Sequence, residues 1–111
     1  MTGKEELLRI IREELADGAA ARRSGNEGKT RVCARRAAGT ALKWWHAEKG
    51  GDVRGADVMH HLRKLSHDRT VPPQIRDAAE RLTAKVSPDF SAPGDPLADS
   101  RSIITYLLDS F

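Results

Sequence analysis

Histidine and arginine are the side chains of this sequence best suited to chemistry. Arg54 is followed by His60 after five intervening residues and by His61 after six. An imidazole can act as a general base, and a guanidinium can stabilise the charge that develops during phosphoryl transfer. Arg54 and His60 are therefore a candidate catalytic pair. The alternative is a chance spacing, because the chain holds many arginines and four histidines.

The histidines do not have the spacing of a metal site. Chelating histidines on a helix lie three or four positions apart. His60 and His67 are seven positions apart, about two helical turns, and the adjacent His60 and His61 point in directions about 100° apart. We therefore predict no metal. We expect one imidazole to pack at the edge of the fold and the others, with the more distant His46, to be solvated.

No glycine-rich phosphate loop is present either. The "GKT" at 28–30 lacks the upstream glycine of such a loop and follows no strand pattern, so it is better interpreted as the start of a helix. We predict that the protein has no cofactor.

The basic residues near the middle of the chain are the best candidates for binding. From Arg22 to Ala47 the chain has seven basic residues against one acid, whereas from Ser87 onwards it has four aspartates against one arginine. On a helix, Arg31 and Arg35 would form one strip, with Arg36 and Lys43 on a neighbouring strip. Such a stripe predicts binding to the phosphates of a nucleic acid. The alternative is a solvated or intramolecularly paired face.

Helical periodicity dominates the elements that must position these side chains. No stretch alternates apolar and polar residues as a half-buried strand would. Helices are expected at about residues 3–17, 28–48 and 56–66, then from "TVPPQ" onwards, and finally from Asp95, which should cap a helix that starts at Pro96. We expect residues 17–28 to form a frayed end and a loop. The sequence thus predicts one all-α domain over residues 1–111, an antiparallel bundle of about five helices.

The expected helix over 28–48 has a broad apolar face. Ala34, Ala38 and Ala41 share this face with Trp45, which we therefore expect to be buried, whereas Trp44 is turned away and should be partly exposed. Cys33, the only cysteine, should be a small buried residue. A single cysteine forms no internal disulfide, and no apolar run is long enough to span a membrane, so we expect a cytoplasmic protein.

The order of these features resembles the HEPN family of small helical bundles. The alanine-rich helix "ARRAAGTALK" fits the family's A-x-x-A-A-x-x-A-L-K pattern through Ala34, Ala37, Ala38, Ala41, Leu42 and Lys43. "HHLRKL" fits its H-x-L-x-x-L element through His60, Leu62 and Leu65. The resemblance covers nearly the whole chain. It implies a helical bundle and nucleotide binding. The small alanines of the expected helix over 28–48 beside a large aromatic are typical of a dimer seam, so we expect a homodimer.

Two further implications come from the resemblance alone. Ribonuclease members of the family carry an arginine, four to six residues and a histidine near the start of the last helix. Here the last helix has Arg101 with Tyr106 five positions later, and the only match is Arg54 with His60 or His61, near the third expected helix. Stand-alone members of the family often pair with small nucleotidyltransferases, in toxin–antitoxin or other two-gene modules.

The sequence therefore predicts a HEPN-like binding or interaction module without catalysis. Its expected partners are a second copy of the chain, a small nucleotidyltransferase, and RNA or nucleotide phosphates bound by Arg31, Arg35, Arg36 and Lys43, with no membrane contact. The alternative is a metal-independent ribonuclease of the toxin type, which would use Arg54 and His60 across a dimer cleft.

Overall fold

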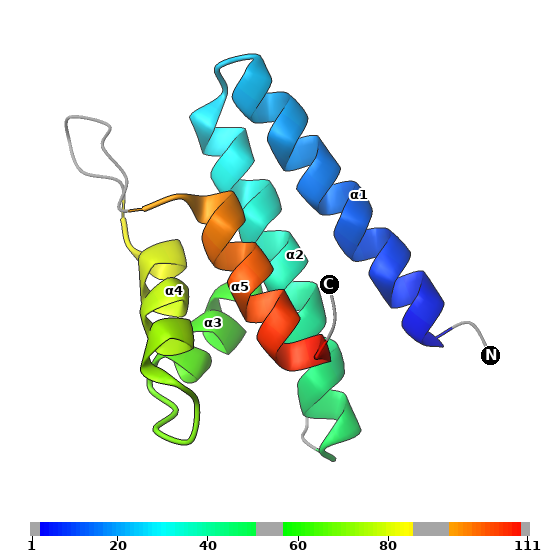
Figure 1. The fold of residues 1–111 in the computed structure, drawn as a ribbon, viewed down its shortest axis with the longest axis vertical. Helices are drawn as coiled ribbons and strands as arrows, with labels where there is room; N and C mark the ends of the chain where they lie inside the picture. Colours follow the sequence, from blue (N-terminus) through cyan, green and yellow to red (C-terminus); the bar gives the residue numbers. More distant parts are fainter. Residues whose placement is uncertain (1–2, 51–56, 86–93, 110–111) are drawn as a thin grey trace.

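Five α-helices and no strand make up the part of the chain that the computed structural model describes, residues 3–50, 57–85 and 94–109 (Figure 1). This confirms the all-α prediction. The helices are α1 (Gly3–Arg23), α2 (Glu27–Glu48), α3 (Val58–Ser66), α4 (Pro73–Thr83) and α5 (Pro96–Leu108).

Helix α2 lies at the centre of the bundle. It forms a long antiparallel hairpin with α1, and α5 packs along another side of α2. Helices α3 and α4 lie on the side of α2 away from α1 (Figure 1). Every other helix therefore contacts α2. Its two sides, one towards α1 and α5 and the other towards α3 and α4, set the geometry of the fold.

Helix α1 is six residues longer than the periodicity predicts. It continues through Gly18 to Arg23 and is stopped by Gly25, which has a φ of +80°. The amide of Gly25 donates to the carbonyl of Arg22 at 3.0 Å and that of Asn26 to the carbonyl of Ala21 at 2.8 Å, the two bonds of a Schellman motif. The expectation of a frayed end and loop from residue 17 was therefore wrong, because the stop signal is Gly25.

Gly18 stays inside the helix because packing requires a residue without a side chain. A Cβ there would lie 2.9 Å from Leu97 Cδ2 and 3.1 Å from the Cβ of Cys33. The glycine thus lets α1 approach both α2 and α5, which outweighs its low helix propensity.

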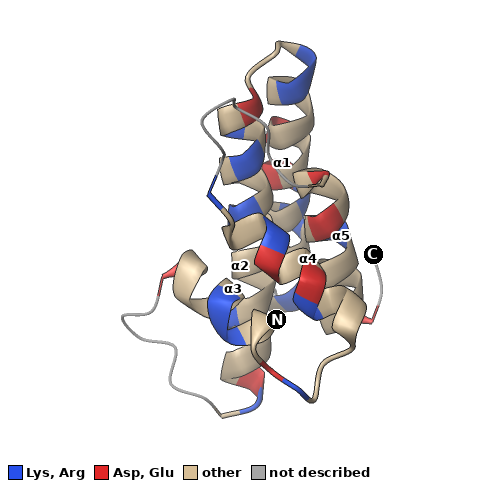
Figure 2. Ribbon diagram, turned by 90° about the vertical axis from the view of Figure 1, so that its left-hand side faces the viewer, with Lys and Arg blue, Asp and Glu red and all other residues tan. Residues whose placement is uncertain are grey.

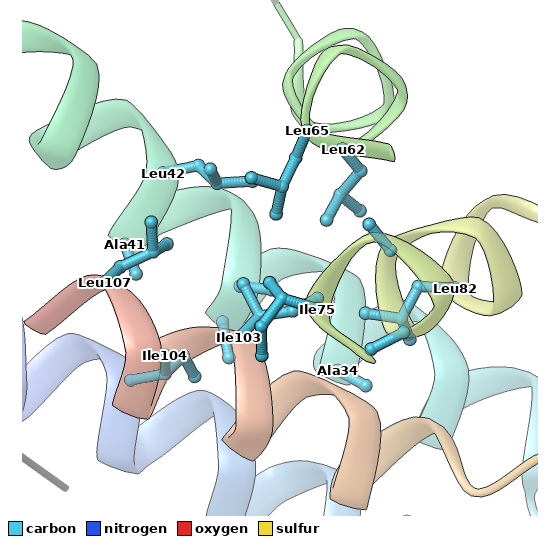
Figure 3. Close-up of a cluster of buried hydrophobic side chains, with 14 of the residues drawn as sticks. Ala34, Ala41, Leu42, Leu62, Leu65, Ile75, Leu82, Ile103, Ile104 and Leu107 are labelled. Carbon is cyan, nitrogen blue, oxygen red and sulfur yellow. The ribbon is translucent and has the colours of Figure 1, made fainter. Parts of the chain in front are cut away.

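The core is built from aliphatic side chains of four helices around the small residues of α2 (Figure 3). Burying each leucine or isoleucine contributes about 1.5–3 kcal/mol. The labelled members are Ala34, Ala41 and Leu42 of α2, Leu62 and Leu65 of α3, Ile75 and Leu82 of α4, and Ile103, Ile104 and Leu107 of α5. Cys33 is also buried, as predicted, and burial raises the pKa of its thiol.

The helix starts follow the signals in the sequence. Asp95 caps α5 by accepting from the amides of Leu97 and Ala98, with Pro96 in the first turn as predicted. Asp57 caps α3 through the amide of His60, and α4 begins at Pro73. The starts of α3 and α5 are thus fixed by local side-chain bonds.

In the part of the chain that the structure describes, no helix has the length and apolar character needed to cross a membrane.

Candidate polyanion-binding face

Arg31 does not lie on a solvent-facing strip. Only 4% of its surface is exposed, and its guanidinium donates to the carbonyls of Arg81 and Ala84 at the end of α4, the latter at 2.9 Å. Burial and the nearby Arg35 lower its pKa. The prediction that this arginine faces away from the packed side of the helix was therefore wrong.

Arg35, one turn further along α2, makes the same kind of contact. Its Nε donates to the carbonyl of Leu82 at 2.6 Å and its Nη2 to that of Ala84 at 3.4 Å. The last carbonyls of a helix have no partner within the helix and carry a partial negative charge. The two arginines thus cap the C-terminal end of α4 and join it to α2.

Arg36 and Lys43 are exposed, as predicted. They lie seven positions apart on α2 and so share one strip of the helix. Helix α3 adds two further exposed cations, Arg63 and Lys64. We call the surface formed by Arg36, Lys43, Arg63 and Lys64 the basic face; Figure 2 shows basic positions on both α2 and α3.

The cations of α2 and α3 are close enough to influence common neighbours. Lys43 and Lys64 both lower the pKa of His61, although burial is the larger cause. Arg63 lowers the pKa of Arg35, again after burial. The tertiary structure therefore brings together basic residues that the sequence places about twenty positions apart.

No ion pair joins any cation of the basic face to a carboxylate of the described residues. The nearby acids make local bonds instead. Asp57 accepts from the backbone amide of His60 at 2.7 Å, and Asp68 accepts from the amide and hydroxyl of Thr70 at 2.9 and 2.6 Å. Within the described residues, no carboxylate therefore neutralises the positive charge of the face through an ion pair.

A shallow groove of about 320 Å³ adjoins the basic face between α2 and α3. Val32, Val58 and Met59 provide its apolar lining, and Arg35, Arg36 and Asp57 the polar part. Beside the groove, Gly39 lets the start of α3 rest directly on α2, because a Cβ there would lie 2.6 Å from Val58.

The histidines divide only partly as the sequence predicts: one imidazole is buried and two are exposed, but His46, which was expected to be solvated, is half-buried. His61 is buried, whereas His60 and His67 are exposed. The unexpected partner is His46 of α2, which is half-buried and lies with its Nδ1 3.0 Å from Nδ1 of His61. The described residues contain no group of three or more histidine, cysteine or acidic side chains that could hold a metal ion.

Of the candidate catalytic pair, Arg54 and His60, the structure describes only His60. His60 lies exposed in the first turn of α3, three and four positions before Arg63 and Lys64, and so on the same side of the helix. Arg54 lies outside the described residues. The pairing of Arg54 with His60 therefore stays a prediction.

The two tryptophans are both half-buried and pack against the core. This matches the expectation for Trp44 and corrects that for Trp45, which is not fully buried because it lies in the last turn of α2. A lysine accompanies each ring: the Nζ of Lys49 is 4.4 Å from the ring of Trp45, and that of Lys4 is 6.0 Å from the ring of Trp44. Neither tryptophan belongs to the basic face.

Comparisons of this chain with protein-family models, with curated proteins and with solved structures found no match.

Proposed function

We propose that this HEPN-like bundle is a binding module without catalysis that holds the phosphate groups of RNA on its basic face. The observation that carries the proposal is the set of four exposed cations, contributed by two helices, that make no ion pair within the described residues. Unpaired cations gathered on one face attract polyanions and release counterions when these bind.

The arginines that cap α4 support this face indirectly. Arg31 and Arg35 bind carbonyls of α4, so they fix α2 against the α3–α4 side of the bundle. Arg36 and Lys43 are thereby held at a set distance from Arg63 and Lys64. A preorganised face loses less conformational entropy on binding than separate flexible side chains would.

The apolar groove favours single-stranded over double-stranded RNA. Its lining of Val32, Val58 and Met59 lies beside Arg36 and would cover the face of an unstacked base or a ribose. Specific recognition of RNA mostly targets such unstacked nucleotides, because the grooves of a double helix present few base edges to side chains.

Fluorescence anisotropy with a labelled single-stranded RNA tests the proposal. Four phosphate contacts predict a slope of log K against log salt of about −3, and thus about 50-fold weaker binding in 200 mM than in 50 mM salt. The double variant R36E/K43E should bind much more weakly and with a shallower slope. Exposed Arg101 on α5 offers a matched control, and R101E should bind as the wild type does.

Equal loss of affinity in R101E and in R36E/K43E would contradict the assignment of the basic face. The absence of any salt-dependent RNA binding by the wild type would remove the proposal altogether. Circular dichroism of each variant confirms that the helices are intact before affinities are compared.

Ribonuclease activity is the second candidate, favoured by the exposed position of His60 beside Arg63 and Lys64. In this alternative, His60 and Arg54 of two copies would form a dimer cleft, as the HEPN resemblance implies. RNA incubated with the protein would then be cleaved, and His60→Ala would abolish cleavage while leaving binding and fold intact. Intact RNA after prolonged incubation supports the non-catalytic proposal.

The resemblance also makes a small nucleotidyltransferase a proposed protein partner. Such an enzyme encoded beside this chain would be tested by co-expression and co-purification. A partner that covers the basic face should compete with RNA for it, whereas one that binds α1 should leave RNA affinity unchanged.

A further inference from the structure

Two imidazoles form the direct polar link between α2 and α3. Nδ1 of His46 and Nδ1 of His61 are 3.0 Å apart, and the ring centroids are 5.1 Å apart. The centroid separation fits two rings whose Nδ1 atoms face each other. The contact is a hydrogen bond in which one ring donates and the other accepts.

The buried side of the pair has no second partner. His61 is 4% exposed, and its Nε2 is buried without a hydrogen-bond partner. Most buried polar atoms in proteins have one. His46 is half-buried and lies nearer to solvent. A proton on Nε2 of His61 would thus be an unpaired donor inside the bundle.

The charges around the pair are mainly positive. Lys43 acts on it from α2 and Lys64 from α3, together with the titratable His60, while Asp68 in the turn after α3 is the one acid among the described residues that acts on His46. From α4, the other helix packed against α3, no described charged group acts on either imidazole. Burial, followed by the positive neighbours, lowers the pKa of both histidines, and Asp68 acts in the opposite direction on His46.

Proton accounting shows what acid does to the contact. Two neutral rings share one proton between the Nδ1 atoms. If one extra proton is added and the Nδ1 contact is kept, both Nε2 atoms must carry hydrogen. His61 then has a buried donor without an acceptor, and a positive charge is added between two lysines. Two extra protons place N–H groups face to face at 3.0 Å, which no hydrogen bond can accommodate.

We propose that the His46–His61 contact is a pH-sensitive latch that holds α3 against α2 when both rings are neutral and releases α3 on acidification. Its effect on RNA rests on the proposed function, because the basic face takes two of its cations from each of these helices. Release would separate Arg36 and Lys43 from Arg63 and Lys64, and RNA binding would weaken. The opposite effect, stronger binding in acid, is the ordinary result of protonating an exposed histidine beside a polyanion.

Amide hydrogen exchange without RNA tests the latch itself. Between pH 7.5 and pH 5.0, after correction for the intrinsic exchange rates, the protection of α3 amides should fall about tenfold or more. The amides of α5, which supplies neither imidazole, should keep their protection. An equal fall in α3 and α5 would mean acid unfolding of the whole bundle and would overturn the latch.

Matched variants assign the effect to the pair. His46→Asn keeps a polar partner for His61 but cannot be protonated, so α3 should stay protected at pH 5.0 to within about twofold. His61→Leu, which fills the buried position with an apolar group, should do the same if His46→Asn folds poorly. The control His67→Asn removes an exposed histidine and should keep the wild-type pH response, as should His60→Asn. A pH response that persists in both His46→Asn and His61→Leu would overturn the latch.

RNA affinity measured at both pH values separates the latch from the proposed function. We expect wild-type affinity to fall about tenfold at pH 5.0, and the affinity of His46→Asn to stay constant or to rise. Should no RNA bind at pH 7.5, the proposed function fails, while the exchange data still decide the latch. Should wild type and His46→Asn both gain affinity equally in acid, the latch does not control the basic face.

Discussion

The two sides of α2 hold the bundle together in different ways. Towards α1 and α5 the helix presents mainly small apolar residues, and Gly18 and the alanines let the backbones approach. The hydrogen bonds on this side come from uncharged hydroxyls, those of Thr30 and Ser100. Towards α3 and α4 it also packs through Gly39 and Leu42, but here it adds arginines and a histidine that form hydrogen bonds to carbonyls and to an imidazole.

The difference matters because the two kinds of contact respond to different conditions. Apolar packing between neutral side chains does not depend on pH. Contacts that involve imidazoles depend on the protonation state of the rings. The polar side also carries exposed cations, which are available to bind a ligand. The apolar side should therefore set stability, while the polar side carries the candidate site.

The largest expected effect is the loss of an apolar contact on the α5 side. Ile104 is fully buried, so Ile104→Ala should lower the free energy of unfolding by about 2–5 kcal/mol, measured by urea denaturation. The exposed neighbour Thr105 is the control, and Thr105→Ala should change it by less than about 0.5 kcal/mol. A small loss for Ile104→Ala would mean that the apolar side of α2 does not dominate stability.

Removing a polar contact on the α4 side should cost less. Arg31→Ala leaves the carbonyls of Arg81 and Ala84 without this donor, so we expect a loss of about 2 kcal/mol. Arg36→Ala removes an exposed cation five positions further along α2 and should cost less than about 0.5 kcal/mol. Equal losses in the two variants would contradict the different roles given to these arginines.

A smaller effect is expected where α3 meets α2. Gly39→Ala gains about 1 kcal/mol of helix propensity but places a Cβ 2.6 Å from Val58, and overpacking of this kind costs about 1–3 kcal/mol. We expect a net loss of about 1 kcal/mol. Gly28→Ala, whose Cβ would meet its nearest neighbour only at 3.8 Å, should not be destabilising. Adding Val58→Ala to Gly39→Ala should recover the loss.

The smallest effect is the change of stability with mild acid. Because the pKa values of His46 and His61 are lowered in the folded state, the unfolded chain takes up protons first, and stability falls as the pH drops below about 6.5. The lowered pKa values of Asp68 and Asp95 affect stability only at more acidic pH, below about 4.

Urea denaturation at pH 7.5 and 5.5 measures this difference and compares the two sides of α2. Ile104→Ala should lose the same free energy at both pH values. His46→Asn should show a smaller acid loss than the wild type does. An acid loss in His46→Asn equal to that of the wild type would locate the titrating groups elsewhere.

Local signals in the sequence predicted most of the fold. Asp95, Pro96 and Pro73 mark helix starts that depend only on nearby backbone groups, so no tertiary information was needed. The end of α1 was placed at about residue 17 instead of Arg23, and the approach of Leu97 and Cys33 explains why Gly18 lies inside the helix.

The candidate site was predicted less completely. Helical spacing placed Arg36 and Lys43 together, but it could not show that the end of α4 would meet Arg31 and Arg35. Arg63 and Lys64 were missed, although a signal existed: they lie between Leu62 and Leu65, which point inward, and so had to face outward. The partnership of His46 with His61 left no signal, because it joins two helices.

The sequence by itself determined the helices, their caps and the apolar face of α2, because these follow from propensity, periodicity and bonds within a few residues. Only the tertiary structure decided which polar side chains of α2 are exposed. A helix can pack against neighbours on more than one side. A cation that faces away from the apolar stripe can therefore still be buried where another helix ends with unpaired carbonyls. Arg31 and Arg36 show this difference: five positions apart on one helix, one is fixed inside the bundle and the other is open to solvent.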